Sequence, residues 1–189
     1  MPRYLQFEVS LIDIEPRIWR RFLDTATFNA LSRAIQDAGP WQGYHLWEFC
    51  ELGRPHVVLA GIPDDEYGEP APDARYIKVS KMLKYPGDRC LYRYDFGDGW
   101  EHEVKLEKWV DLDEVFKRRL LAGERSFPPE DCGGTYGYDE CLLAVGERPQ
   151  KRDYVRPVPT PQDLEERRVW LGDWTPEFDV ETASERFDR

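Results

Sequence analysis

The stretch that most constrains the fold is residues 92–103, YRYDFGDGWEHE. Alternating aromatic and charged residues flank Gly97–Gly99, and glycines supply the positive φ that short hairpin loops need. Pairing Phe96 with Trp100 across a three-residue loop gathers the aromatic residues of both strands on one face, together with His102. We therefore predict a β-hairpin with an acidic tip. Its buried face holds His102 either as a structural core histidine or as a functional one.

The other face of this predicted hairpin is charged. The same register places Leu91, Arg93 and Asp95 opposite Lys105, Glu103 and Glu101. Arg93 and Glu103 would then form a cross-strand pair of opposite charge. A shift by one residue would mix the apolar and charged faces, so the pattern specifies which side chains point inward.

The composition favours an acidic globular protein. Its 189 residues include 26 Lys and Arg against 37 Asp and Glu, which gives a net charge of −11. Seven tryptophans indicate a packed core, and the length suits a single domain. An acidic chain repels nucleic-acid phosphates, so non-specific nucleic-acid binding is disfavoured. The apolar runs are too short for a membrane span, so we expect a cytoplasmic protein that does not contact membranes.

The cysteine pattern predicts free thiols. Cys50, Cys90, Cys132 and Cys141 are scattered and form no C-x-x-C pair. Such spacing is typical of neither a zinc knuckle nor a disulfide scaffold, so we expect buried, unpaired cysteines.

Hydrophobic periodicity predicts an α+β fold with an antiparallel-rich sheet and helices packed on it. The strands are expected at residues 4–11, 17–23, 45–49 and 54–60, besides the hairpin, and the helices at 28–38, 111–121, 138–145, 163–170 and 180–187. A loop is expected at 61–74 and a single helical turn at 80–85. We expect an α+β core domain over residues 1–146. Residues 147–189 would add a connector and short helices that pack on the same domain.

A second motif follows the hairpin at residues 127–138, FPPEDCGGTYGY. Two prolines and three glycines in twelve residues specify a rigid shape, more constrained than a connector requires. The motif carries Glu130 and Asp131, and the hairpin tip carries carboxylates of its own. We predict that Asp95–His102 and Pro128–Gly134 lie side by side and form the functional surface.

Several of these stretches together resemble one known family. They are Ile18–Arg21, Tyr44–Leu46 with Glu48–Phe49, Tyr94–His102, Ala122–Arg125, Pro128–Gly134 with Gly137–Tyr138, and Trp170–Gly172 with Phe178–Asp179. In this order they are similar to the plasmid pRiA4b ORF-3-like family. The resemblance implies an α+β domain with an antiparallel-rich sheet. Most members have no known function, and some are labelled resolvase-like passengers of insertion elements.

Three functions remain open, and the first is a binding or regulatory module. The motifs are rich in aromatic, Gly, Pro and acidic residues, which suit a shaped recognition surface, and no nucleophile–base pair stands out. This favours a non-enzyme whose partner is a protein or a small anionic ligand. The candidate surface comprises Asp95, Asp98, Glu101, His102, Glu130, Asp131, His45, Arg20 and Arg21.

The second candidate is a metal-assisted hydrolase acting on a phosphoester or similar anion. No cofactor is evident, but clustered carboxylates suit a divalent cation. Its ligands would come from Asp95, Asp98, Glu101, Glu130 and Asp131, with His45 or His102 as the proton carrier. Alternatively, Arg125 or the pair Arg20 and Arg21 would neutralise these carboxylates, which would make the cluster structural.

The third candidate is a nucleic-acid-binding accessory protein. Its support is a set of short basic runs at Arg17–Arg21, Lys117–Arg119, Lys151–Arg152 and Arg167–Arg168. With the overall charge of −11, it would need these residues to form a segregated basic stripe.

Overall fold

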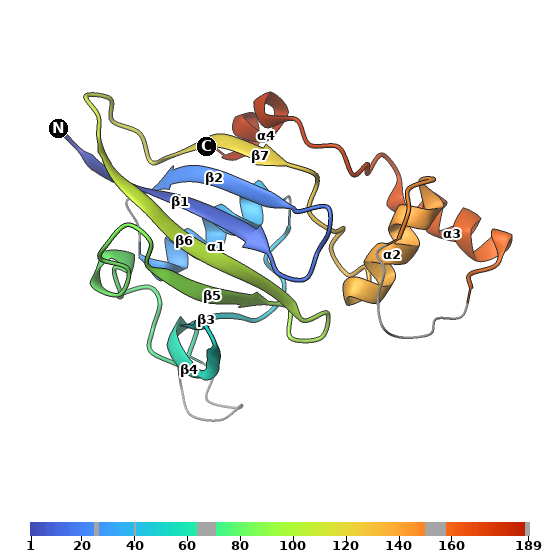
Figure 1. The fold of residues 1–189 in the computed structure, drawn as a ribbon, viewed down its shortest axis with the longest axis horizontal. Helices are drawn as coiled ribbons and strands as arrows, with labels where there is room; N and C mark the ends of the chain where they lie inside the picture. The colour runs from blue at the N-terminus through green and yellow to red at the C-terminus, as the bar shows by residue number, and fades with distance from the viewer. Residues whose placement is uncertain (25–26, 40, 64–70, 150–157, 188–189) are drawn as a thin grey trace.

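A computed structural model describes residues 1–24, 27–39, 41–63, 71–149 and 158–187. Seven strands form one antiparallel sheet in the order β4-β3-β5-β6-β1-β2-β7 (Figure 1). The elements are β1 (Arg3–Leu11), β2 (Trp19–Asp24), α1 (Phe28–Ala38), β3 (Trp47–Glu51), β4 (Arg54–Gly61), a 3₁₀ turn (Val79–Lys81), β5 (Arg89–Tyr94), β6 (Trp100–Asp111), β7 (Arg118–Glu124), α2 (Gly134–Ala144), α3 (Pro161–Leu171) and α4 (Val180–Phe187). The predicted α+β class is confirmed.

The inner face of the sheet is covered by α1 (Figure 1). The helix begins after Thr27, whose side chain accepts a hydrogen bond from the Ala30 N–H at 3.3 Å. Its apolar stripe, including Phe28 and Ile35, is fully buried. Phe28 packs against Phe49 of β3 with ring centroids 4.8 Å apart, which places the main core between α1 and the sheet.

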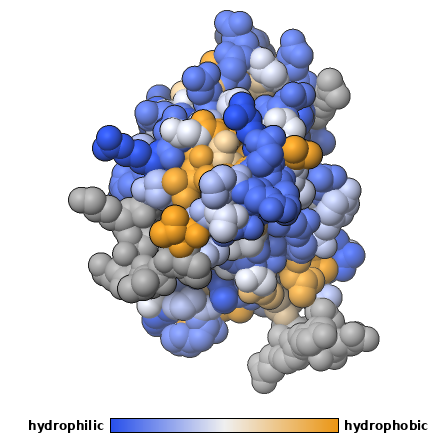
Figure 2. Space-filling model, turned by 90° about the vertical axis from the view of Figure 1, so that its right-hand side faces the viewer, coloured by the Kyte–Doolittle hydropathy of each residue, from blue (hydrophilic) through white to orange (hydrophobic). Residues whose placement is uncertain are grey.

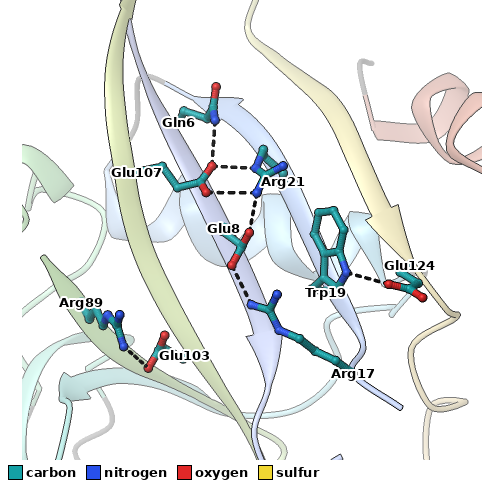
Figure 3. A network of polar contacts seen from close by, with 9 residues as sticks. All are labelled: Gln6, Glu8, Arg17, Trp19, Arg21, Arg89, Glu103, Glu107 and Glu124. Atoms are coloured by element: carbon teal, nitrogen blue, oxygen red, sulfur yellow. Dashed lines mark hydrogen bonds and ion pairs between the residues drawn. The ribbon is translucent and has the colours of Figure 1, made fainter. Parts of the chain in front are cut away.

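The opposite face of the sheet carries charged side chains (Figure 3), and no helix of the described residues covers it (Figure 1). Arg21 contacts Glu8 and Glu107, each at 2.6 Å, and Arg17 contacts Glu8 at 2.6 Å. Lone surface ion pairs contribute little, but carboxylates shared between arginines form a network that fixes side-chain positions. Arg21 of β2 and Arg17, which precedes the strand, are therefore paired with carboxylates of β1 and β6.

The predicted hairpin exists, but its register differs from the prediction by two residues. Tyr94 pairs with Trp100 and Arg93 with Glu101, and a five-residue loop replaces the expected three-residue loop. The backbone turns at Asp95, which has a positive φ of 53°. A shift of two residues keeps each side chain on its predicted face, so Trp100 is buried as expected. Phe96 lies in the loop instead and is 49% exposed.

The predicted helix at residues 111–121 is wrong. β6 continues to Asp111, and Arg118–Glu124 forms the edge strand β7, which pairs with β2. Contacts with residues distant in the sequence explain the difference. The buried Arg118 donates from Nε to the Phe187 carbonyl at 2.6 Å and also pairs with Asp37. These contacts need an extended backbone that local helical periodicity cannot reveal.

The remaining helices lie at one end and one edge of the sheet. α2 and α3 pack against each other beyond the strand ends, whereas α4 packs on β7 and α1 (Figure 1). α2 begins four residues before its predicted start, and α3 and α4 match their predicted positions within two residues. Figure 2 shows the α2–α3 end, where hydrophobic residues form small groups among hydrophilic ones. Part of the predicted connector and of the 61–74 loop falls outside the described residues.

β4 and β7 form the two edges of the sheet. β4 contains Pro55, which lacks a backbone N–H, and the register between β3 and β4 shifts twice. All four cysteines are free and buried, as predicted. Among the described residues, no helix combines the length and the apolar character needed to cross a bilayer.

Candidate functional site

The hairpin tip (residues 95–99) and the Pro-Pro/Gly-Gly loop (residues 128–134) lie side by side. The Gly133 N–H donates to Oδ2 of Asp98 at 3.1 Å. A Cβ at Gly134 would approach the Asp98 carbonyl oxygen to 2.7 Å, and Gly134 has a φ of 64°. Only glycine allows this close approach with this backbone conformation. The two motifs are therefore in contact, as predicted.

A third segment, residues 41–46, completes the site. The indole N–H of Trp41 donates to the Pro128 carbonyl at 2.8 Å, and the Asp95 N–H donates to the Leu46 carbonyl at 3.0 Å. Trp41 also stacks on Tyr94, with ring centroids 4.8 Å apart and planes within 13°. This segment thus bridges both motifs, and it carries His45 into the space between them.

His45 lies at the centre of three carboxylates. Its Nε2 is 2.8 Å from Oδ1 of Asp131, 3.6 Å from Oδ2 of Asp95 and 3.9 Å from Oε1 of Glu130. Nε2 is buried but makes no hydrogen bond of acceptable geometry. The ligand atoms of His45, Asp95 and Asp131 all lie within 4.8 Å of one another, an arrangement that can hold a metal ion.

Asp95 is held by its own loop in a way that leaves one oxygen available. Its Oδ1 accepts the N–H groups of Gly97 at 3.0 Å and Asp98 at 3.2 Å. Its Oδ2 faces His45. Asp95 and Asp131 both adopt a positive φ, 53° and 56°, which is uncommon for non-glycine residues. Residues in such strained conformations cluster at functional sites, because the surrounding structure must enforce them.

Glu130 is fixed by two donors from the surrounding segments. Its Oε1 accepts from the Tyr94 hydroxyl at 2.6 Å, and its Oε2 accepts from the Gln42 N–H. Burial, together with this hydrogen bond to a carboxylate, raises the pKa of Tyr94. Tyr94 therefore stays protonated and serves as a permanent donor. Glu130 contributes negative charge beside the cluster, while both of its oxygens are already engaged.

The metal ligands proposed from sequence are only partly brought together. Asp131 faces His45 and Glu130 lies beside it, but Asp98 instead accepts from the loop backbone. Glu101 points to the outer face of the sheet, 3.7 Å from Arg93. The alternation of a strand explains this, because Glu101 lies between the inward-facing Trp100 and His102.

His102 is a core residue. It is fully buried, and its Nδ1 lies 3.4 Å from the Tyr92 carbonyl. Burial lowers its pKa to about 3, so it is neutral at physiological pH. Its ring packs edge-on against Trp41, with ring centroids 5.4 Å apart. His102 therefore supports the site through packing and is not a proton carrier at the surface of the site.

The candidate arginines occupy other positions. Arg21 belongs to the charged network on the face of the sheet opposite α1. Arg20 is buried between Phe127 and Phe178, and its guanidinium carbon lies 4.8 Å and 3.5 Å from their ring centroids. In the part of the chain that the structure describes, neither Arg20 nor Arg125 forms an ion pair with the carboxylate cluster. The proposed neutralisation by arginine is therefore not seen there.

The other basic runs are partly paired. Arg118 pairs with Asp37, Arg119 with Glu114 at 2.5 Å, and Arg167 with Glu140 at 2.6 Å. Lys151–Arg152 lies outside the described residues. Paired arginines have less free charge for nucleic-acid phosphates, so the arrangement gives the basic-stripe hypothesis little support.

Sequence reasoning named His45 and all the carboxylates of the cluster and predicted that the two acidic motifs meet, but it did not predict that His45 lies between Asp95 and Asp131. It also missed Tyr94 and Gln42 as donors to Glu130. The sequence did contain a signal for Tyr94. The hairpin pattern predicts that Tyr94 is buried, and a buried tyrosine hydroxyl needs a hydrogen-bond partner. No local signal pointed to the Gln42 backbone.

Known proteins share both the sequence pattern and the fold. The sequence is 34% identical over 151 residues to the uncharacterized protein y4hQ of Sinorhizobium fredii (strain NBRC 101917 / NGR234), covering 78% of this chain and 76% of that protein. The structure is similar to the crystal structure of MM3350, a protein of unknown function from Methanosarcina mazei Go1. That similarity has a TM-score of 0.76 and 31% identity, and it covers 96% of both chains.

The pattern that defines one protein family extends over almost the whole chain. It matches residues 3–184, a range that includes every strand, the hairpin tip, the Pro-Pro/Gly-Gly loop and the segment with His45. The chain belongs to the plasmid pRiA4b ORF-3-like protein family.

Proposed function

We propose that the protein is a binding module that holds a divalent metal ion through His45, Asp95 and Asp131 and uses the open side of the ion to bind a small anion. One observation carries the proposal: a buried imidazole nitrogen without a hydrogen bond faces carboxylate oxygens from two other segments. A bound cation would satisfy the nitrogen and relieve the repulsion between the carboxylates.

The donor set indicates the class of metal. One imidazole nitrogen and two carboxylate oxygens suit borderline ions such as Zn²⁺ or Mn²⁺ better than Ca²⁺, which prefers six or more oxygens. Metal–ligand distances near 2.1 Å require ligand atoms closer together than 4.8 Å. The exposed side chain of Asp131 can make this adjustment, because 63% of its surface is free.

The open side of the site favours an anionic ligand. Three protein ligands leave at least one coordination position, and the exposed Asp131 marks the side that faces solvent. A small carboxylate or phosphate at that position would bind through the metal. This explains how a chain with a charge of −11 can recognise an anion without a basic surface.

Metal-assisted hydrolysis is the second candidate, and the open coordination position is the observation in its favour. Hydrolysis would also need a general base beside that position. Glu130 is the nearest further carboxylate, but both of its oxygens accept hydrogen bonds from Tyr94 and Gln42. Binding therefore has better support than catalysis. Steady hydrolysis of p-nitrophenyl phosphate that depends on added Mn²⁺ or Zn²⁺ would favour the hydrolase instead.

The test is calorimetric titration of the metal-free protein with Zn²⁺ and Mn²⁺. The wild type should bind one ion, and Asp131→Asn should weaken binding at least tenfold without loss of stability, since this side chain is exposed. His45→Gln and Asp95→Asn should weaken it as much or more. Glu101→Gln is the matched control, because this carboxylate belongs to the same hairpin but faces away.

Two results would contradict the proposal. One is the absence of saturable binding of either ion at micromolar protein concentration. The other is equal weakening by Glu101→Gln and Asp131→Asn, which would indicate diffuse attraction to an acidic surface. The anion is tested separately with inorganic phosphate, which should bind the metal-loaded protein and not the metal-free one.

A further inference from the structure

A pocket around Arg20 forms a second candidate site. Arg20 extends from β2 and is only 1% exposed. Its Nε donates to the Ala38 carbonyl at 3.1 Å, and its Nη1 donates to the carbonyls of Trp19 at 2.8 Å and Glu124 at 3.2 Å. Its Nη2 is buried and has no hydrogen-bond partner.

The charge of Arg20 is also uncompensated. In the described residues no carboxylate lies within ion-pair distance of its guanidinium. Burial lowers its pKa to about 9, so it remains charged at neutral pH. A buried charge without a counter-ion is costly, and a buried donor without an acceptor adds to that cost. Stacking on Phe178 and Phe127 offsets only part of it.

Arg20 forms part of the wall of a pocket of about 300 Å³. The pocket lies between the end of α1, the segment at residues 173–179 and α4. That segment is held by hydrogen bonds from Ser126 N–H to the Pro176 carbonyl at 2.9 Å and from the Trp174 indole to the Phe127 carbonyl at 3.1 Å. These hydrogen bonds fix the segment that forms one wall of the pocket. The volume of the pocket suits a small molecule.

The rim of the pocket carries mainly the opposite charge, since Asp173, Glu177 and Asp179 line it together with Arg186. Asp173 and Glu177 are exposed and line it, and within the described residues neither forms an ion pair. Asp179 also lines it, and its Oδ1 accepts from the Thr182 N–H at 2.8 Å, which lowers its pKa and keeps it ionised. Phosphates and other multiply charged anions would be repelled by this rim.

We propose that this pocket binds a small zwitterion, in the manner of a free α-amino acid, with its carboxylate on Arg20 and its ammonium group on the rim at Asp173 and Glu177. The carboxylate would supply the acceptor that Nη2 lacks, and the hydrogen bond would be strengthened because both partners are charged. Trp174 and Phe178 line the same pocket and would contact an apolar side chain. This pocket is separate from the proposed metal site at His45, Asp95 and Asp131 and does not depend on it.

The experiment measures thermal shift and calorimetric affinity with glycine, L-leucine, L-phenylalanine and L-lysine. At least one free amino acid should raise Tm and bind saturably at millimolar concentration. Its N-acetyl derivative and its methyl ester should each bind at least tenfold more weakly, because each removes one of the two charges. Binding that survives either modification would overturn the proposal, as would the absence of binding by all four.

Variants locate the site. The double variant Asp173→Asn, Glu177→Gln changes only exposed side chains, so it should fold normally and bind at least tenfold more weakly. Arg20→Lys keeps the charge but loses the fork of donors, and should also weaken binding. Glu181→Gln, exposed on α4 outside the pocket, is the control and should bind like the wild type. Unchanged affinity in the double variant would place the ligand elsewhere and refute the assignment.

Discussion

The hydroxyl of Tyr94 donates a hydrogen bond of 2.6 Å to Oε1 of Glu130, so the last residue of β5 is bound to the loop that carries Asp131. This bond joins the two motifs through two side chains, whereas the Gly133 N–H joins them by donating to the side chain of Asp98. It also places a third carboxylate beside His45. The candidate metal site is therefore organised by an uncharged donor that stays protonated.

Tyr94→Phe tests the energetic value of this bond. The substitution leaves a largely buried carboxylate oxygen without its donor, and hydrogen bonds to charged groups contribute about 1.5–3 kcal/mol. We expect a loss of that order in the free energy of unfolding, measured by urea denaturation. Tyr44→Phe is the matched control, because the exposed Tyr44 hydroxyl donates to the Gln42 side chain at 2.6 Å and should contribute less than about 1 kcal/mol. Equal losses in the two variants would contradict the assigned role.

Trp100→Ala tests the corrected hairpin. Trp100 is 3% exposed and should cost about 3–5 kcal/mol on truncation. Phe96→Ala, four residues earlier, should cost less than about 1 kcal/mol, because Phe96 is 49% exposed and lies in the loop. Thermal or chemical unfolding separates the two. The three-residue loop predicted from sequence would make both aromatic residues core residues, with similar losses.

Gly137→Ala tests the packing of α2 beneath the Pro-Pro/Gly-Gly loop. A Cβ at this position would overlap the carbonyl group of Cys132, next to Asp131, so the loop would have to move. We expect a loss of several kcal/mol or more and weaker metal binding. Gly146→Ala is the control, since its Cβ would meet open space and only its φ of 82° opposes the change, at a cost of about 1–2 kcal/mol. Similar behaviour of the two variants would show that the clash is relieved without moving the loop.

His102 predicts a pH dependence of stability. Its pKa is lowered to about 3 in the fold, below the ordinary value of 6.5, so the unfolded chain binds the extra proton between these values. The stabilisation is complete above about pH 6.5 and declines by about 1.4 kcal/mol per pH unit as the pH falls toward 3. Urea denaturation between pH 7 and pH 5 should show a shallower dependence for His102→Gln. The exposed His56→Gln should keep the slope of the wild type, and a wild-type slope in His102→Gln would refute the prediction.

The sequence predicted faces better than pairings. Alternation correctly placed Trp100 and His102 on the buried side of the hairpin, because side-chain direction depends only on the period of two. The register depended on the loop, and the positive φ of Asp95 lengthened it to five residues. Aspartate tolerates that conformation more readily than most residues, but its presence alone does not require it.

Long-range contacts explain the other differences. The run around Arg118 has helical periodicity, yet contacts with Asp37 and with α4 favour an edge strand. The site shows the same limit. The alternation of the hairpin already placed Glu101 on its charged face, but only the fold shows that His45, from a separate segment, lies among the carboxylates.

The two edges of the sheet have a consequence for assembly. A partner that added a strand to the sheet would need an edge with a continuous row of free N–H and carbonyl groups. β4 interrupts such a row with Pro55 and an irregular register, and α4 packs against β7 at the other edge. β-augmentation is therefore disfavoured at both ends of the sheet. A protein partner is therefore expected to bind the loops and side chains of this molecule rather than to extend its sheet.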